Sequence, residues 1–179
     1  MKLLSAIAVI ACSIPISAEA DEYMEPKQLA EAYLGNCVLN AGRIDKTKAA
    51  ARTFGYSELD EDMALMLAPQ DPNADFRAWA AGGSKSELFF LGVSESEIDR
   101  QKMAVCVVAH PYVSSTATVA EIKAILNFGD LVSDEVSVGQ RTRIWTADHV
   151  VRGALIILTD VQQIGEVGGT YGFMAPAEE

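Results

Sequence analysis

Apolar positions in the first third of the chain repeat every three to four residues, the spacing of one helix face. The segment that starts at Pro26 begins with a residue type favoured in the first turn of a helix. The apolar residues that follow at this spacing are Leu29, Tyr33, Cys37, Ala41 and Ile44. The pattern predicts a helix whose buried face carries a cysteine.

A second helix is predicted over 45–56, in "DKTKAAARTFGY". Asp45 suits its N-cap, and Gly55 followed by the apolar Tyr56 suits a left-handed C-terminal stop. The acidic stretch 57–67, "SELDEDMALML", is interpreted as a short third helix with a solvated start. Its charge also fits a docking site for cations.

Past residue 73 the pattern changes to short runs rich in β-branched and aromatic residues, which predict strands. The predicted strands are 74–81, 87–93, 103–110, 140–146, 150–160 and 169–175. "GGSKS" between the first two fits a hairpin turn, and "SESEIDRQ" before the third is interpreted as a polar connection. The third strand, "MAVCVVAH", is apolar at nearly every position, which predicts a central strand with both faces covered.

One more helix is predicted over 118–130, between the two groups of strands. Thr118 and Glu121 form a capping-box pattern, and Gly129 marks the end. Short links between strands favour antiparallel neighbours. The order of helices, three strands, a helix and three strands predicts an α+β fold, with one antiparallel sheet of about six strands and helices on one face.

The N-terminal segment 1–20 has the pattern of a secretory signal peptide: one lysine, a short apolar run and a small-x-small exit ending at Ala20. The apolar run is too short for a membrane-spanning helix of about 20 residues. We expect cleavage near Ala20 and a periplasmic or secreted protein, with a single α+β domain over 21–179. The alternative is a lipoprotein, because "VIAC" ending at Cys12 looks like a lipobox.

The charge of the chain limits its partners. It carries 25 acidic and 14 basic residues, a net charge of −11. Such a chain repels phosphate, which argues against nucleic acid and anionic membrane. The expected partner is a protein or a small ligand, and the pattern sets no oligomeric state. No cofactor is predicted, because the glycines of "GEVGGTYG" lack the spacing of a dinucleotide fingerprint and fit turn and bulge positions instead.

Two cysteines remain once the signal peptide is removed, Cys37 and Cys106. An even number in an exported protein predicts a disulfide, which would pin the first helix to the central strand. Two cysteines and two scattered histidines are too few for a metal site. Cys106 and His110 would lie about 13 Å apart in a strand, too far for a nucleophile and its base.

Two arginine–tryptophan arrays are the predicted binding residues. Arg77 and Trp79 share one strand face, and Arg141, Arg143 and Trp145 share another. Arginine and tryptophan are enriched at binding hot spots. Cross-strand cation–π packing is the alternative explanation.

The two histidines are the remaining candidates for chemistry. His110 ends the central strand and fits either a general base or a strand-end residue before a turn. Asp148 can orient His149, but both residue types are also common in hairpin turns. No nucleophile elbow is present in the sequence. No catalytic residue is therefore predicted, and a hydrolase using His110 or Asp148 and His149 is the alternative function.

Several motifs together resemble a group of small uncharacterised exported proteins of Gram-negative bacteria. The motifs are a cysteine on a helix, an alanine-rich helix ending in glycine and an aromatic residue, and a "CVV" strand: Cys37, Ala49–Ala51, Gly55, Tyr56 and Cys106–Val108. The resemblance implies export and the disulfide, and no functional residue. The sequence thus favours a small exported, non-catalytic domain that binds a protein or small ligand through a sheet face, as an envelope accessory, inhibitor or immunity-type protein.

Overall fold

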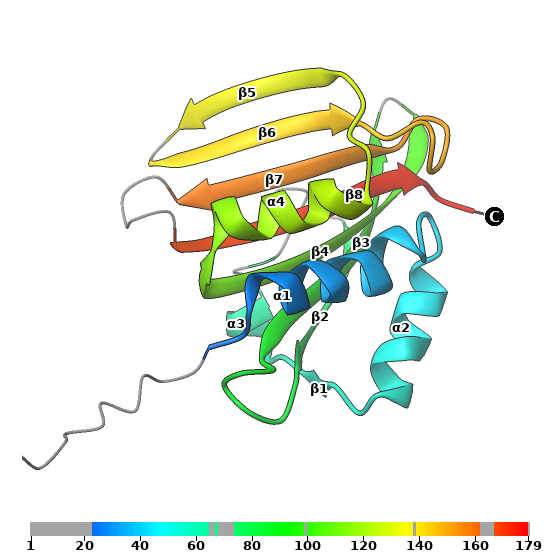
Figure 1. Ribbon diagram of the computed structural model, residues 1–179. Helices are drawn as coiled ribbons and strands as arrows, with labels where there is room; N and C mark the ends of the chain where they lie inside the picture. The colour runs from blue at the N-terminus through cyan, green and yellow to red at the C-terminus, as the bar shows by residue number, and fades with distance from the viewer. Residues whose placement is uncertain are drawn as a thin grey trace, which may run out of the picture.

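The computed structural model describes residues 23–64, 67, 74–98, 100–137, 139–161 and 167–178 (Figure 1). The predicted signal peptide and the alternative lipidation site at Cys12 lie outside these residues, so both stay predictions. None of the helices in the described ranges is long and apolar enough to cross a bilayer.

The fold is α+β with one antiparallel sheet, as predicted, but the sheet has eight strands rather than about six. The elements are α1 (Pro26–Tyr33), the π-helical η1 (Leu34–Val38), α2 (Ile44–Thr53), β1 (Ser57–Glu58), α3 (Glu61–Ala64), β2 (Asp75–Ala81), β3 (Phe89–Ile98), β4 (Gln101–Ser114), α4 (Ser115–Ile125), β5 (Leu131–Ser137), β6 (Gln140–Thr146), β7 (Leu155–Val161) and β8 (Val167–Pro176). Their order across the sheet is β1-β2-β3-β4-β8-β7-β6-β5. The last strand pairs with β4, which joins the two groups of strands into one sheet.

The two strands that the sequence pattern missed are the two edges of the sheet. β1 has two residues, both exposed, and pairs with Trp79 and Ala80 of β2. β5 is exposed at every position except Ser133. An edge strand without a buried face lacks the apolar alternation by which strands are recognised. The pattern therefore gives two strands too few.

The polar connection predicted before the central strand is also wrong. The run "SESEIDRQ" extends β3 to Ile98 and begins β4 at Gln101, so that the two strands form a long hairpin. The register places Glu97 opposite Lys102, and opposite charges on facing strands stabilise the pairing. This pairing explains why the polar ends of β3 and β4 form strands although they have no alternation of apolar and polar residues.

Four helical segments cover one face of the sheet. In Figure 1, α1 and α4 lie in front of the strands, and α1 packs beside α4. On the same side, η1 contacts β4 and β8, and α2 contacts β3 and β4. We call this side of the sheet the covered face and the opposite side the open face. The short α3 lies on the open face, against β2, near Phe76 and Ala78.

Strand residues alternate between the two faces, and their burial follows. Seven large apolar side chains on the covered face are at most 2% exposed: Leu91, Val93, Val108, Ile156, Leu158, Tyr171 and Phe173. On the open face of the central strand β4, Val105 and Val107 are only half-buried. β4 is central, as predicted, but the prediction that both its faces are covered holds only in part, because Met103 and Ala109 are buried on the open face while Val105 and Val107 are not.

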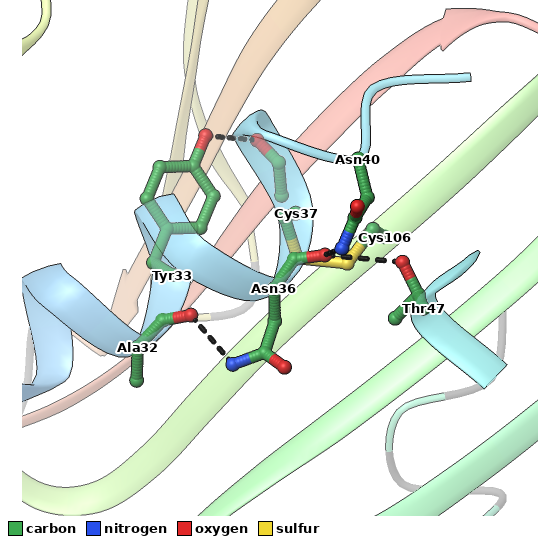
Figure 2. Close-up of a disulfide and its surroundings, with 8 residues drawn as sticks. Ala32, Tyr33, Asn36, Cys37, Asn40, Thr47 and Cys106 are labelled. Atoms are coloured by element: carbon green, nitrogen blue, oxygen red, sulfur yellow. Dashed lines mark hydrogen bonds between the residues drawn. A yellow bond between two sulfur atoms is a disulfide. The ribbon is translucent and has the colours of Figure 1, made fainter. Parts of the chain in front are cut away.

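The predicted disulfide joins Cys37 of η1 to Cys106 of β4, with Cα atoms 5.2 Å apart and a sequence separation of 69 (Figure 2). It links the first helical segment to the central strand, as expected. All five apolar positions predicted for the buried helix face are buried, but the first helical segment ends at Val38, so that Ala41 lies in a turn and Ile44 begins α2. The helix layer is thus fixed to the covered face both covalently and by packing.

Two buried hydroxyl groups beside the disulfide add hydrogen bonds across this interface. Tyr33 donates to the carbonyl of Gly172 on β8 at 3.0 Å, and its burial raises the pKa of the phenol. Thr47 of α2 donates to the carbonyl of Asn36 at 3.0 Å (Figure 2). Leaving a buried hydroxyl unpaired costs stability, so these contacts help to fix α1, η1 and α2 relative to each other and to the sheet.

Both predicted N-terminal helix caps are wrong. The N-cap of α4 is Ser114, whose hydroxyl accepts a hydrogen bond from the backbone N–H of Ala117. Thr118 lies inside that helix and is fully buried. Asp45 lies in the first turn of α2, where Arg43 is the N-cap. Ser114 belongs to the end of β4, so the helix begins directly where the strand ends.

The predicted C-terminal stop of α2 is confirmed. Gly55 has a φ of +69°, and the N–H groups of Tyr56 and Gly55 donate to the carbonyls of Ala51 and Arg52. This is the Schellman arrangement. Tyr56 then packs edge-on against Phe89, with ring centroids 5.8 Å apart, which connects the end of α2 to β3.

Candidate functional site

The five residues predicted to bind a partner lie in two separate places on the covered face. Arg77 and Trp79 are on β2, and Arg141, Arg143 and Trp145 are on β6. Four strands separate β2 from β6, about 24 Å at the usual spacing of strands. The two arrays therefore do not form one site.

The arginines of both arrays are paired with carboxylates. The nitrogen-to-oxygen distances are 3.0 Å for Arg77–Glu58, 2.7 Å for Arg141–Asp134 and 2.7 Å for Arg143–Asp160. Hydrogen bonding to Arg141 lowers the pKa of the Asp134 carboxyl. Trp145 is buried, with Lys123 and Arg143 over its ring. These contacts favour packing within the fold, and the binding role of the arrays stays a prediction.

Asp148 and His149 lie in the turn 147–154 that joins β6 to β7, where both are exposed. The carboxylate of Asp148 accepts the backbone N–H of Gly153 at 2.7 Å, so it closes the turn. Because Gly153 has a φ of +79°, the chain cannot be extended there, and β7 starts at Leu155 rather than at the predicted residue 150. The geometry assigns Asp148 to the turn.

His110 lies inside β4 rather than at its end and is 2% exposed. Its Nδ1 accepts hydrogen bonds from the backbone N–H groups of Tyr112 at 3.0 Å and Val113 at 3.1 Å. A nitrogen that accepts two such bonds carries no proton, so the neutral ring is protonated at Nε2. Burial lowers the pKa of His110. The ring is thus neutral, and neither nitrogen is free to act as a general base.

These two hydrogen bonds stabilise a bulge in β4. The ladder with β8 pairs His110 with Gly169, shifts register, and resumes at Ser114. Gly168 lies opposite the bulge with a φ of +87°, and a Cβ there would come within 2.7 Å of the carbonyl oxygen of Pro111. Only glycine fits this position. The interpretation of "GEVGGTYG" as containing bulge glycines is confirmed for Gly168.

A pocket of about 560 Å³ lies beside the bulge, at one end of the open face. On one side its lining is apolar and comes from β3, β4 and the segment around α3: Leu59, Met63, Leu67, Phe90 and Ala109. On the other side, β6, β7 and β8 contribute Gln140, Thr159 and Thr170. A pocket of this volume is within the range of small-molecule sites, about 300–1,000 Å³.

The described lining of the pocket is uncharged. It contains no Asp, Glu, Lys or Arg, and its one titratable imidazole, His110, is kept neutral. Within the described ranges, no group of three or more histidine, cysteine, aspartate or glutamate side chains is arranged to hold a metal ion. The chemistry that this site offers is apolar contact and neutral hydrogen bonding.

Sequence reasoning singled out His110 but missed the other side chains of this pocket. Four strands each contribute one side chain that points to the open face: Phe90, Ala109, Thr159 and Thr170. The alternation of side chains between the two faces of each strand could have shown that each of these residues shares a face with its strand neighbours two positions away. It does not reveal that the four residues are neighbours, because that depends on the register of strands far apart in sequence.

Comparisons with known proteins do not identify the site. No family model, curated protein or solved structure matches the chain. The resemblance to small exported proteins of Gram-negative bacteria therefore stays a prediction, and the function has to be argued from the pocket.

Proposed function

We propose that this protein is a small exported, non-catalytic domain that binds a small, mostly apolar ligand in the pocket on the open face of its sheet. The observation that carries the proposal is the pocket of about 560 Å³ itself, with apolar walls and a few neutral polar groups. Concave apolar sites with a few polar groups are the usual form of small-molecule sites.

Two further observations support parts of this proposal. The disulfide between Cys37 and Cys106 fits an exported protein, because disulfides persist in oxidising compartments. The site is concave, and a concave site favours a small ligand over a partner protein. A role as an envelope accessory protein that carries such a ligand is consistent with both observations.

A hydrolase is less well supported by the same geometry. Nδ1 of His110 is occupied by two backbone N–H groups, and the carboxylate of Asp148 accepts a backbone N–H of its own turn. A general base needs an unprotonated nitrogen or oxygen that can reach a substrate proton. These contacts give binding the stronger argument.

The proposal is tested by titrating the purified protein with N-phenylnaphthylamine, an apolar dye that fluoresces when it leaves water. We expect saturable binding that Ala109→Leu weakens by about tenfold or more, because the larger side chain occupies space in the pocket. The matched control is Ala80→Leu, the same change on the open face at a position that does not line the pocket. It should bind the dye like the wild type.

Melting curves establish that both variants fold. If Ala109→Leu does not fold, Phe90→Ala takes its place, because it removes an apolar wall of the pocket and should also weaken binding. Absence of saturable binding, or equal binding by the pocket variant and the Ala80→Leu control, would refute the proposal.

A further inference from the structure

We infer that the ligand is an uncharged amphiphile, with an apolar chain against Phe90 and Ala109 and a neutral hydrogen-bonding headgroup against Thr159 and Thr170. This inference rests on the proposed function, because it names the chemical class that the same pocket would hold. It follows from three features of the site: a polarity gradient, the hydrogen-bonding capacity at its polar end, and the absence of charge in its described lining.

The polarity gradient follows directly from the register of the sheet. Consecutive cross-strand partners form one row of open-face side chains from β2 to β6, namely Ala80, Phe90, Ala109, Thr170, Thr159 and Thr142. The three residues of this row on β2, β3 and β4 are apolar, and the three on β8, β7 and β6 are threonines. The pocket lies over the middle of the row, from Phe90 to Thr159. A ligand lying along the row would pass from apolar to polar surroundings.

The polar end of the row can both donate and accept hydrogen bonds. The hydroxyl groups of Thr159 and Thr142 are 3.1 Å apart, and each hydroxyl offers one donor and two acceptor positions. The Thr159–Thr142 bond therefore leaves capacity for a ligand. Gln140 adds an amide that donates and accepts. A headgroup of the same kind, such as a primary amide or a hydroxyl, satisfies these groups best.

A charged headgroup fits this site poorly. Moving an ionised group from water into an apolar pocket is costly unless an opposite charge pairs with it, and the described lining supplies no Asp, Glu, Lys or Arg. The net charge of −11 further disfavours an anion through long-range repulsion. Carboxylates such as ionised fatty acids are therefore excluded more strongly than neutral amphiphiles of the same chain length.

The test is displacement of bound N-phenylnaphthylamine by three probes with the same alkyl chain: decanoamide, decanoate and decylammonium, at a pH where the last two are ionised. We expect decanoamide to displace the dye at a concentration at least about tenfold lower than either charged probe. If decanoate or decylammonium displaces the dye as well as decanoamide, the inference about the ligand class is wrong, while dye binding still supports the proposed function.

The second arm locates the headgroup. Thr170→Val keeps the shape of the side chain but removes its hydroxyl, and should weaken decanoamide binding by about threefold to tenfold, once the displacement curve is corrected for the dye affinity of the variant itself. The matched control is Thr142→Val, in the same row but outside the pocket lining, with a change below about twofold. Equal effects of the two variants would contradict the placement of the headgroup. If the wild type does not bind the dye at all, the proposed function fails, and this inference fails with it.

Discussion

Neighbouring residues on β7 show how differently the two faces of the sheet are used. Leu158 points to the covered face and is 2% exposed, whereas Ile157 points to the open face and is only half-buried. The same contrast holds on β4, where Val108 is fully buried and Val107 is half-buried. On these two inner strands, solvent reaches side chains of the open face beside a fully buried residue of the covered face.

This difference separates stability from binding. Burying a large apolar side chain stabilises the fold by about 1.5–3 kcal/mol, and the largest fully buried side chains of the strands lie on the covered face, under α1, η1, α2 and α4. The open face contributes less per residue. It can therefore leave a pocket unfilled between Phe90 and Thr159 without loss of the core.

Removal of the disulfide should give one of the two largest effects, because it removes the covalent link between the helix layer and the covered face. A bridge with a sequence separation of 69 stabilises by about 4 kcal/mol in the chain-entropy model, and often by less. The double variant Cys37→Ala/Cys106→Ala should therefore lose about 2–4 kcal/mol of unfolding free energy in urea denaturation under oxidising conditions. Dye binding on the open face should persist at temperatures where the variant is folded.

The control for this experiment is the reductant. Wild-type protein in reductant should approach the stability of the double variant, and the variant itself should not respond to reductant. Alkylation of both cysteines in the native, unreduced protein would show that the bridge does not form.

A pair of truncations measures the contrast between the faces directly. Leu158→Ala removes a buried side chain from the covered face and should cost about 2–5 kcal/mol of unfolding free energy. Ile157→Ala, on the adjacent residue, should cost about half as much, because its side chain is already partly solvated. Equal losses in urea denaturation would mean that the open face is as tightly packed as the covered face.

The sequence predicts the covered face well and the open face poorly, for a physical reason. The helical spacing of apolar residues predicts buried positions such as Leu29 and Tyr33. The even number of cysteines in the predicted mature chain predicts the disulfide. Burial on one face imposes these signals on every element that contributes to it. The edge strands β1 and β5 bury no face, so they carry no such signal and were missed.

The pocket could not be predicted for a different reason. Its row of side chains runs across β3, β4, β8 and β7. These strands are neighbours in this order only because β8, the last strand, pairs with β4. Thr159 and Thr170 are unremarkable in sequence, and they become neighbours through the register. Of the pocket residues, His110 alone is chemically distinctive, and its ring supports the bulge.

Replacement of His110 by asparagine should give the smallest effect at neutral pH. The imidazole is buried and holds the bulge beside the pocket through Nδ1. In His110→Asn the side-chain oxygen can accept the same two N–H bonds, so we expect a loss below about 1 kcal/mol. His110→Ala leaves two backbone donors unpaired and should cost about 1–3 kcal/mol.

The pH dependence distinguishes this role from simple packing. Burial lowers the pKa of His110 in the folded protein from its ordinary value of 6.5, so the unfolded chain binds this proton more readily than the folded chain. The unfolding free energy contributed by His110 is therefore fully present above pH 6.5 and is lost as the pH falls from 6.5 through the lowered folded pKa. His110→Asn should remove this part of the pH dependence in urea denaturation, while His149→Asn, an exposed control, should retain it. An unchanged pH profile in His110→Asn would mean that folding does not lower the pKa of His110, and that the imidazole is not held neutral in the folded protein.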